Sequence, residues 1–130
     1  MCSPLTRAIE TALLSFGSLG IPIKAFPHLQ PLHSFDSGIG VDMDKLKKKF
    51  SEVDILDLSL VEKGWNSKEG KWDPKQHKLV MKEMDLWLRG LMNPQEGARR
   101  EIALVSHSSW ITEFLKRHGI PCTFIKPDNH

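Results

Sequence analysis

Apolar side chains recur every three or four residues near the start of the chain, which is the spacing of an amphipathic helix. Ser3 is suited to the N-cap of this helix and Pro4 to its first position. The helix is predicted to end at the glycines of residues 17–20. A shorter helix is expected over residues 42–50. The stripe of the first helix comprises Leu5, Ala8, Ile9, Ala12, Leu13 and Phe16.

Two later segments show the same helical spacing. One helix is predicted to run from Asp73, as its N-cap, and Pro74 to about residue 89, with Gly90 as its stop. Another is predicted to open within residues 108–109 and to end at Gly119.

Extended segments are fewer than the helices. EIALVS, at residues 101–106, is the one stretch with the continuous apolar pattern of a buried strand. Residues 21–26 are β-prone, and the proline at position 22 indicates an edge strand or the start of one. Residues 53–61 are predicted to be extended or irregular. The pattern predicts an α/β protein. Because one buried strand cannot cover the stripes of two long helices, we expect the chain to lack a strand at its front.

Composition favours an ordinary soluble domain. The 130 residues are 40% hydrophobic and 26% charged. Their net charge is +2, and the one dense basic run, KLKKK at residues 45–49, fits a solvated helix face better than a nucleic-acid interface. With no apolar run of ~20 residues and no secretory signal, we expect no membrane contact and a cytoplasmic protein. Cys2 and Cys122 fit no metal-ligand spacing, so two free thiols and no metal are expected.

The junction between the predicted strand at 101–106 and the following helix is the first candidate for chemistry. His107 lies there. Ligands of α/β sheets bind beyond the carboxyl ends of strands, and a helix N-terminus offers free N–H groups to an anion. A histidine at that point can donate a hydrogen bond, carry a proton or act as a nucleophile. The alternative is that His107 caps the helix or fills a pocket.

Arg7 is the second candidate. It falls near the start of the first predicted helix, where a cation is disfavoured by the helix dipole unless an anion lies alongside. A guanidinium fits phosphate oxygens with its planar fork. The alternative is a solvated arginine that pairs with Glu10 or Glu52.

Four motifs, in order along the chain, resemble those of the histidine phosphatase superfamily. SPLTRAIETA at residues 3–12 resembles its S-P-L-x-R-x-x-x-T segment, and IALVSHSSW at 102–110 is similar to its V-T-H-G-G segment. FDSG at 35–38 and WNSKEG at 65–70 look like loops of a phosphoglycerate-mutase-like branch common in fungi. The resemblance implies an incomplete three-layer α/β/α phosphoglycerate-mutase-like fold with its first strand missing. It would form a single truncated domain over residues 1–126, followed by a tail at 127–130.

The resemblance also implies roles for individual residues. The family forms a phosphohistidine on an R-H-G histidine after its first strand, and it uses no metal or organic cofactor. By position, Arg7 matches an arginine that holds the phosphoryl group. His107 matches the second histidine, which stabilises that group. Ser108 falls where backbone N–H groups of the family lie near the site. The implied ligand is phosphate or a phosphomonoester.

The sequence departs from the family in two places. No R-H-G follows a strand, and the string at residues 117–119 closes a predicted helix, so we interpret it as coincidence. The branch has a glutamate after a Leu-Gln pair, whereas here Pro31 follows that pair, which leaves Asp36 and His33 as open alternatives for the proton donor.

Three interpretations remain. The chain is a phosphatase or phosphomutase family member that is inactive alone, since phosphohistidine chemistry needs its nucleophile. Alternatively, it is a non-catalytic anion-binding or protein-interaction module, or a truncated product with no native activity. An exposed sheet edge would also favour self-association.

Overall fold

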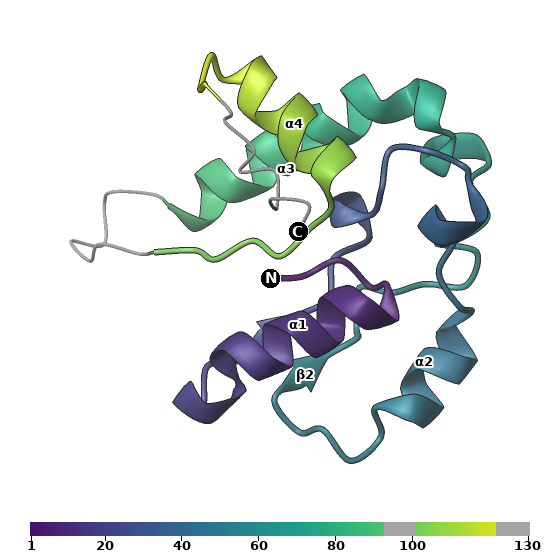
Figure 1. Cartoon of the computed structure of the whole chain (residues 1–130), viewed down its shortest axis with the longest axis vertical. Coiled ribbons are helices and arrows are strands. Elements are labelled where there is room, and N and C mark those ends of the chain that lie inside the picture. Colours follow the sequence, from purple (N-terminus) through teal and green to yellow (C-terminus); the bar gives the residue numbers. More distant parts are fainter. Residues whose placement is uncertain (93–100, 122–130) are drawn as a thin grey trace, which may run out of the picture.

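The computed structural model describes residues 1–92 and 101–121. Within them the chain is α/β, with helices around a small parallel sheet (Figure 1). The α-helices and strands are α1 (Thr6–Phe16), β1 (Ile23–Lys24), α2 (Met43–Lys49), β2 (Leu56–Asp57), α3 (His77–Leu91) and α4 (Ser108–Arg117). Short 3₁₀ helices cover Gly17–Leu19, Pro27–Leu29, Asp36–Gly38, Gly70–Trp72 and Pro74–Gln76.

Four parallel segments meet in the sheet. β1 pairs with β2, with Ile23 opposite Leu56. On the other side of β1, Cys2 bridges to Ala25, and Cys2 also bridges to Val105. The segment around β1 is therefore internal to the sheet, and the edge position suggested by its proline is wrong. Pro22 precedes the paired residues, so its missing N–H removes no bond from the sheet.

The segment at residues 101–106 is not the buried strand that its apolar pattern predicts. Only Val105 is bridged: its N–H donates to Met1 O at 2.9 Å, and its carbonyl accepts from Ser3 N–H at 2.9 Å. Glu101 and Ala103 are exposed. An apolar run indicates that a segment prefers to be buried. A central strand also needs a hydrogen-bonded strand on each side, and among the described residues only residues 1–3 pair with this segment, on one side.

Helix α1 begins three residues after the predicted N-cap. Cys2 is extended in the sheet, so Ser3 cannot cap a helix there, and Leu5 is the N-cap instead. The Ser3 hydroxyl accepts the Leu5 N–H at 3.3 Å. The predicted stripe is confirmed, since Leu5, Ala8, Ile9 and Ala12 are buried. The predicted end is also confirmed, because a 3₁₀ turn follows α1 and Gly20 adopts φ +63°.

The other helices follow their patterns with one exception. Asp42 caps α2 through its side chain, as Lys45 N–H donates to its carboxylate. The helix expected from Asp73 begins as the 3₁₀ turn Pro74–Gln76 and continues as α3. The stop expected at Gly90 is wrong, because α3 continues to Leu91. A single glycine weakens a helix without ending it when the following backbone keeps its hydrogen bonds.

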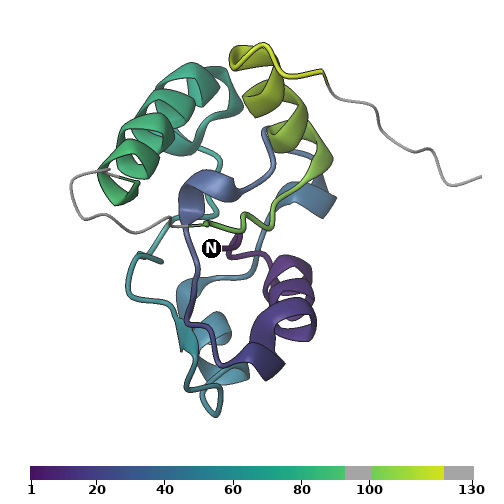
Figure 2. The ribbon, with the colours of Figure 1, turned by 90° about the vertical axis from the view of Figure 1, so that its left-hand side faces the viewer.

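Two clusters of buried side chains make up the core. The first lies under α1, α2 and the strands, and the second joins α3 and α4 to residues 26–29. Figure 2 shows α3 and α4 on one side of the N-terminal segment and α1 on the other. The starts of α1 and α4 meet between the two clusters. The first cluster contains Cys2, Leu5, Ile9, Ala12, Ile23, Ala25, Leu46, Phe50, Val61 and Trp65, and the second contains Phe26, Leu29, Met81, Met84 and Trp110.

Cys2 is a free, fully buried thiol whose pKa is raised to about 11, chiefly by burial. Cys122, the other expected free thiol, lies outside the described residues, as does the predicted tail at 127–130. None of the helices in the described part of the chain has both the length and the apolar character needed to cross a membrane.

Candidate anion-binding site

Arg7 and His107, the two candidates from the sequence, lie side by side. An Arg7 guanidinium nitrogen is 3.4 Å from Nδ1 of His107. Arg7 is in the first turn of α1 and exposed, whereas His107 is the N-cap of α4 and half-buried. The sheet explains the meeting, because the bridge between Cys2 and Val105 places the beginnings of both helices at the same end of neighbouring segments.

The imidazole of His107 is held neutral. Its pKa is lowered to about 4, first by burial and then by electrostatic interaction with Arg7, Lys68 and His33. A guanidinium can only donate hydrogen bonds, so Nδ1 is the acceptor and the ring proton is assigned to Nε2. Nε2 is buried and has no hydrogen-bond partner among the described residues. His107 therefore offers an N–H donor that lacks an acceptor.

Lys68 belongs to the same region, although the sequence pattern gave no reason to select it. It is only 8% exposed, and its Nζ donates to the carbonyl oxygen of Pro31 at 2.7 Å. Burial lowers the pKa of its ammonium group to about 8. The WNSKEG segment was singled out as a loop, but no periodicity marks which side chain of a loop turns inward. Lys68 has φ +58°, a left-handed conformation that a local pattern does not predict for lysine.

His33, left open as a proton donor, lies near enough to His107 to be the smallest of the electrostatic causes that lower its pKa. Its Nδ1 is buried and unpartnered among the described residues, and its ring lies against Phe35 with centroids 5.1 Å apart. A Cβ at Gly38 would meet the His33 ring at 2.5 Å, so this close approach requires glycine. Asp36, the other alternative, is exposed at the start of a 3₁₀ helix.

Three side chains at or just before the start of α4 form hydrogen bonds with the backbone of residues 28–32, which lead into His33. Ser106 Oγ donates to Leu29 O at 2.7 Å, Ser109 Oγ accepts from Leu32 N–H at 3.2 Å, and Trp110 Nε1 donates to His28 O at 2.6 Å. Ser108, which was expected to contribute a backbone N–H, is exposed as the first residue of α4. The loop that carries His33 is thereby fixed beside the N-terminus of α4.

The positive charge of the site has no counter-ion among the residues that the structure describes. Among residues 1–92 and 101–121, no carboxylate forms an ion pair with Arg7 or Lys68. The pairing of Arg7 with Glu10 is contradicted, because Glu10 binds Lys49 at 3.0 Å. A shallow depression of about 300 Å³ opens on the side of Arg7 away from α4, where Glu10, Lys49 and residues 39–41 line it; neither His107 nor Lys68 does. The described residues also bring no three histidine, cysteine or carboxylate side chains together in a way that could hold a metal ion.

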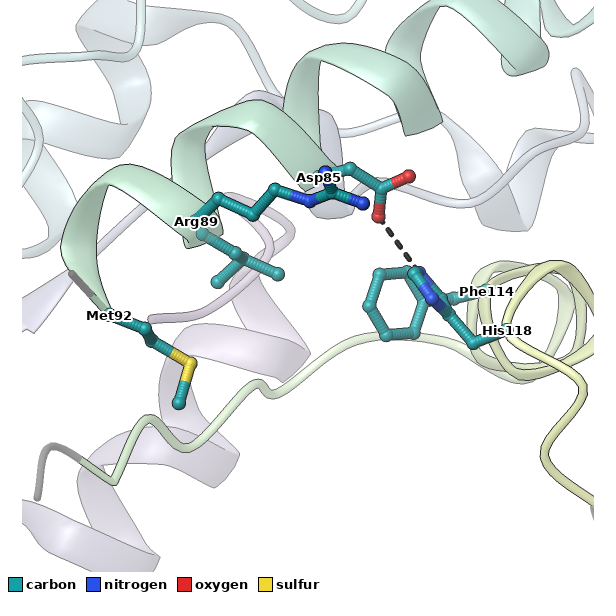
Figure 3. Close-up of a pocket in the computed structure, with 6 residues that line it drawn as sticks. Asp85, Arg89, Met92, Phe114 and His118 are labelled. Atoms are coloured by element: carbon teal, nitrogen blue, oxygen red, sulfur yellow. Dashed lines mark hydrogen bonds and ion pairs between the residues drawn. The ribbon is translucent and has the colours of Figure 1, made fainter. Parts of the chain in front are cut away.

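The R-H-G string at residues 117–119 lies elsewhere. Arg117 is the last residue of α4, His118 follows it, and Gly119 adopts φ +64°. Asp85 of α3 accepts from Arg117 Nε at 2.7 Å. It also pairs with His118 Nε2 at 2.8 Å (Figure 3). These contacts border a pocket of about 370 Å³ between α3 and α4. The string thus closes α4, as the sequence predicted, and its arginine and histidine link α4 to α3.

Comparison with known proteins finds no similar family, sequence or structure. No family model matches the chain, and neither the curated proteins nor the solved structures contain a match.

Proposed function

We propose that this chain binds a phosphate-type oxyanion between the starts of α1 and α4, through Arg7 and His107. The observation that carries the proposal is the buried, unpartnered Nε2 of His107 beside a guanidinium with no carboxylate partner in the described chain. A buried donor without an acceptor is costly, and an anion oxygen is the acceptor that this charge environment favours.

The ligand class follows from the donors. Arg7 supplies a planar fork suited to phosphate oxygens, and the N-terminus of α4 adds the positive end of a helix dipole. The motifs at residues 3–12 and 102–110 resemble the phosphate-holding segments of histidine phosphatases, and these are the segments that meet here. We therefore propose a phosphomonoester or inorganic phosphate as the ligand, and a phosphoglycerate-mutase-like origin for the fold.

Binding without turnover fits this geometry best. A phosphohistidine needs an imidazole nitrogen with a free lone pair that reaches the phosphorus atom. In His107 the lone pair of Nδ1 faces Arg7, and Nε2 carries the proton. No carboxylate of the described chain shares a hydrogen bond with His107, Lys68 or Arg7, so no carboxylate there is placed to protonate a leaving group.

Calorimetric titration with phosphate and with vanadate tests the binding. The wild type should bind saturably, and Arg7→Ala should weaken binding at least about tenfold, as expected for loss of a charged hydrogen bond. Arg89→Ala removes an exposed arginine of α3 outside the site and is the matched control. Absence of binding by the wild type would overturn the proposal.

A second assay tests the absence of turnover. Phosphate release from an aryl phosphate should stay at background. Steady release that His107→Ala abolishes would show that the site is catalytic.

A further inference from the structure

Lys68 is a buried lysine without an acidic partner. It is 8% exposed, and among the described residues its ammonium group makes one hydrogen bond, to Pro31 O at 2.7 Å. An ammonium group has three donors, so two N–H groups remain. Lysine is almost never this buried unless it is paired, because desolvating a charge is costly. Such a group calls for an anion, and residues 1–92 and 101–121 place no carboxylate against it.

A short chain of contacts connects Lys68 to the anion site. The carbonyl of Pro31, which accepts the hydrogen bond from Lys68, directly precedes Leu32. The Leu32 N–H donates to Ser109 Oγ in the first turn of α4. The charge of Lys68 also lowers the pKa of His107, so the ammonium group lies within electrostatic range of the imidazole. Lys68 and Arg7 therefore both act electrostatically on the volume around His107.

The charges in this volume decide what it can hold. Arg7 and Lys68 provide two positive charges, while His107 is neutral and contributes a donor. A singly charged oxyanion would leave one cation uncompensated in a partly desolvated place, whereas a doubly charged one balances both. Phosphomonoesters carry nearly two negative charges at neutral pH, and sulfate esters of the same shape carry one.

We propose that Lys68 is a binding residue of this site and that it makes the site selective for doubly charged oxyanions, such as phosphomonoester dianions, over singly charged anions of the same shape. The proposal rests on the proposed function and adds a third residue and a charge requirement to it. In this proposal Lys68 keeps its hydrogen bond to the Pro31 carbonyl and directs its remaining N–H groups to the ligand.

Methyl phosphate and methyl sulfate are the probes, because they share a shape and differ in charge. In calorimetry at pH 7.5, the wild type should prefer methyl phosphate by at least about tenfold, as expected for one charge-assisted hydrogen bond. Lys68→Gln keeps a donor for Pro31 O but removes the charge. It should lose most of its affinity for methyl phosphate, keep its affinity for methyl sulfate within about threefold, and so remove the preference. Lys63→Gln, on the exposed loop nearby, is the matched control and should leave both affinities unchanged.

The outcomes separate the two proposals. If the wild type binds neither probe, the proposed function fails. If it binds both equally, or if Lys68→Gln keeps the wild-type preference, the role of Lys68 fails while the anion site stands. Circular dichroism and thermal melting check that the glutamine variant folds. If it does not, Lys68→Arg, which keeps both charge and donor, must retain the preference, and a loss of preference in that folded variant overturns the proposal.

Discussion

The guanidinium of Arg7 lies 3.4 Å from Nδ1 of His107, although 100 residues separate them along the chain. The contact depends on the sheet, because Cys2 is paired with Val105 just before each side chain's helix begins. Because Arg7 only donates, this contact fixes the imidazole tautomer and directs the N–H of His107 toward the buried side of the site. The state of His107 should therefore report on both the fold and the ligand.

His107 should titrate far below an ordinary histidine. Its folded pKa of about 4 lies below the usual 6.5, so the folded state holds fewer protons than the unfolded state between these values. The stability that this group contributes is complete above pH 6.5 and declines as the pH falls through 4. NMR titration of the imidazole should give the low pKa in the wild type. Because burial is the largest cause, Arg7→Ala should raise the pKa only part of the way, and a wild-type pKa near 6.5 would contradict the geometry.

Gly40 should not tolerate a side chain. A Cβ there would lie 2.1 Å from the buried ring of Trp65, and the Gly40 carbonyl accepts from Asn66 Nδ2 at 2.7 Å. Gly40→Ala should reduce the free energy of unfolding by about 1–3 kcal/mol through overpacking. Gly90→Ala is the matched control, because its Cβ meets nothing and the residue is helical, so it should stabilise by about 0.5–1 kcal/mol. Urea denaturation measures both, and equal effects would contradict the packing.

Asp85 should hold α4 against α3. Its carboxylate pairs with Arg117 and His118, and its side chain is 11% exposed. Asp85→Asn should lower the free energy of unfolding by about 1–2 kcal/mol, at the lower end for a charged hydrogen-bond pair because both partners are partly exposed. Asp54→Asn removes an exposed carboxylate with no ion pair in the described chain and should change stability by less than about 0.5 kcal/mol. Indistinguishable denaturation midpoints for the two variants would refute the role of Asp85.

Self-association stays a prediction from the sequence. An apolar depression of about 480 Å³ lies between the end of α1 and residues 101–105, and Leu19 lines it with 64% exposure. Sedimentation velocity should show a coefficient that rises with concentration, and Leu19→Lys should reduce that rise. Leu14→Lys changes an equally apolar, 87% exposed residue away from the depression and should not. A concentration-independent monomer would contradict the prediction.

The helices were predictable because their determinants are local. The stripe of α1, the Asp42 cap of α2 and the glycine after α4 depend on residues within one or two turns. The failures involve partners far along the chain. Ser3 looks like a cap until Cys2 is drawn into the sheet, and residues 101–106 look like a buried strand until their neighbours are known.

The residues of the candidate site also differ in how far the sequence alone could identify them. Arg7 and His107 stand out because each is unusual at the start of a helix, and motif resemblance joins them. Lys68 has no such local mark. Its importance comes from its hydrogen bond to the carbonyl of Pro31, 37 positions away, and from the lack of a nearby carboxylate in the described part of the chain, both of which only the folded arrangement reveals.

The pairing of Cys2 with both Ala25 and Val105 has a consequence for how this protein is made. During synthesis the N-terminal residues emerge first, but one of their two neighbours in the sheet is not translated until residue 105. The stripe of α1 is covered before then, because the buried residues of its cluster all lie between Cys2 and Trp65. The backbone edge of residues 1–3 nevertheless stays unpaired on one side, and closing the long loop to residue 105 is an entropic barrier to the last step. Nascent chains that stall before that point would expose this edge, and unpaired strand edges make such intermediates prone to aggregate.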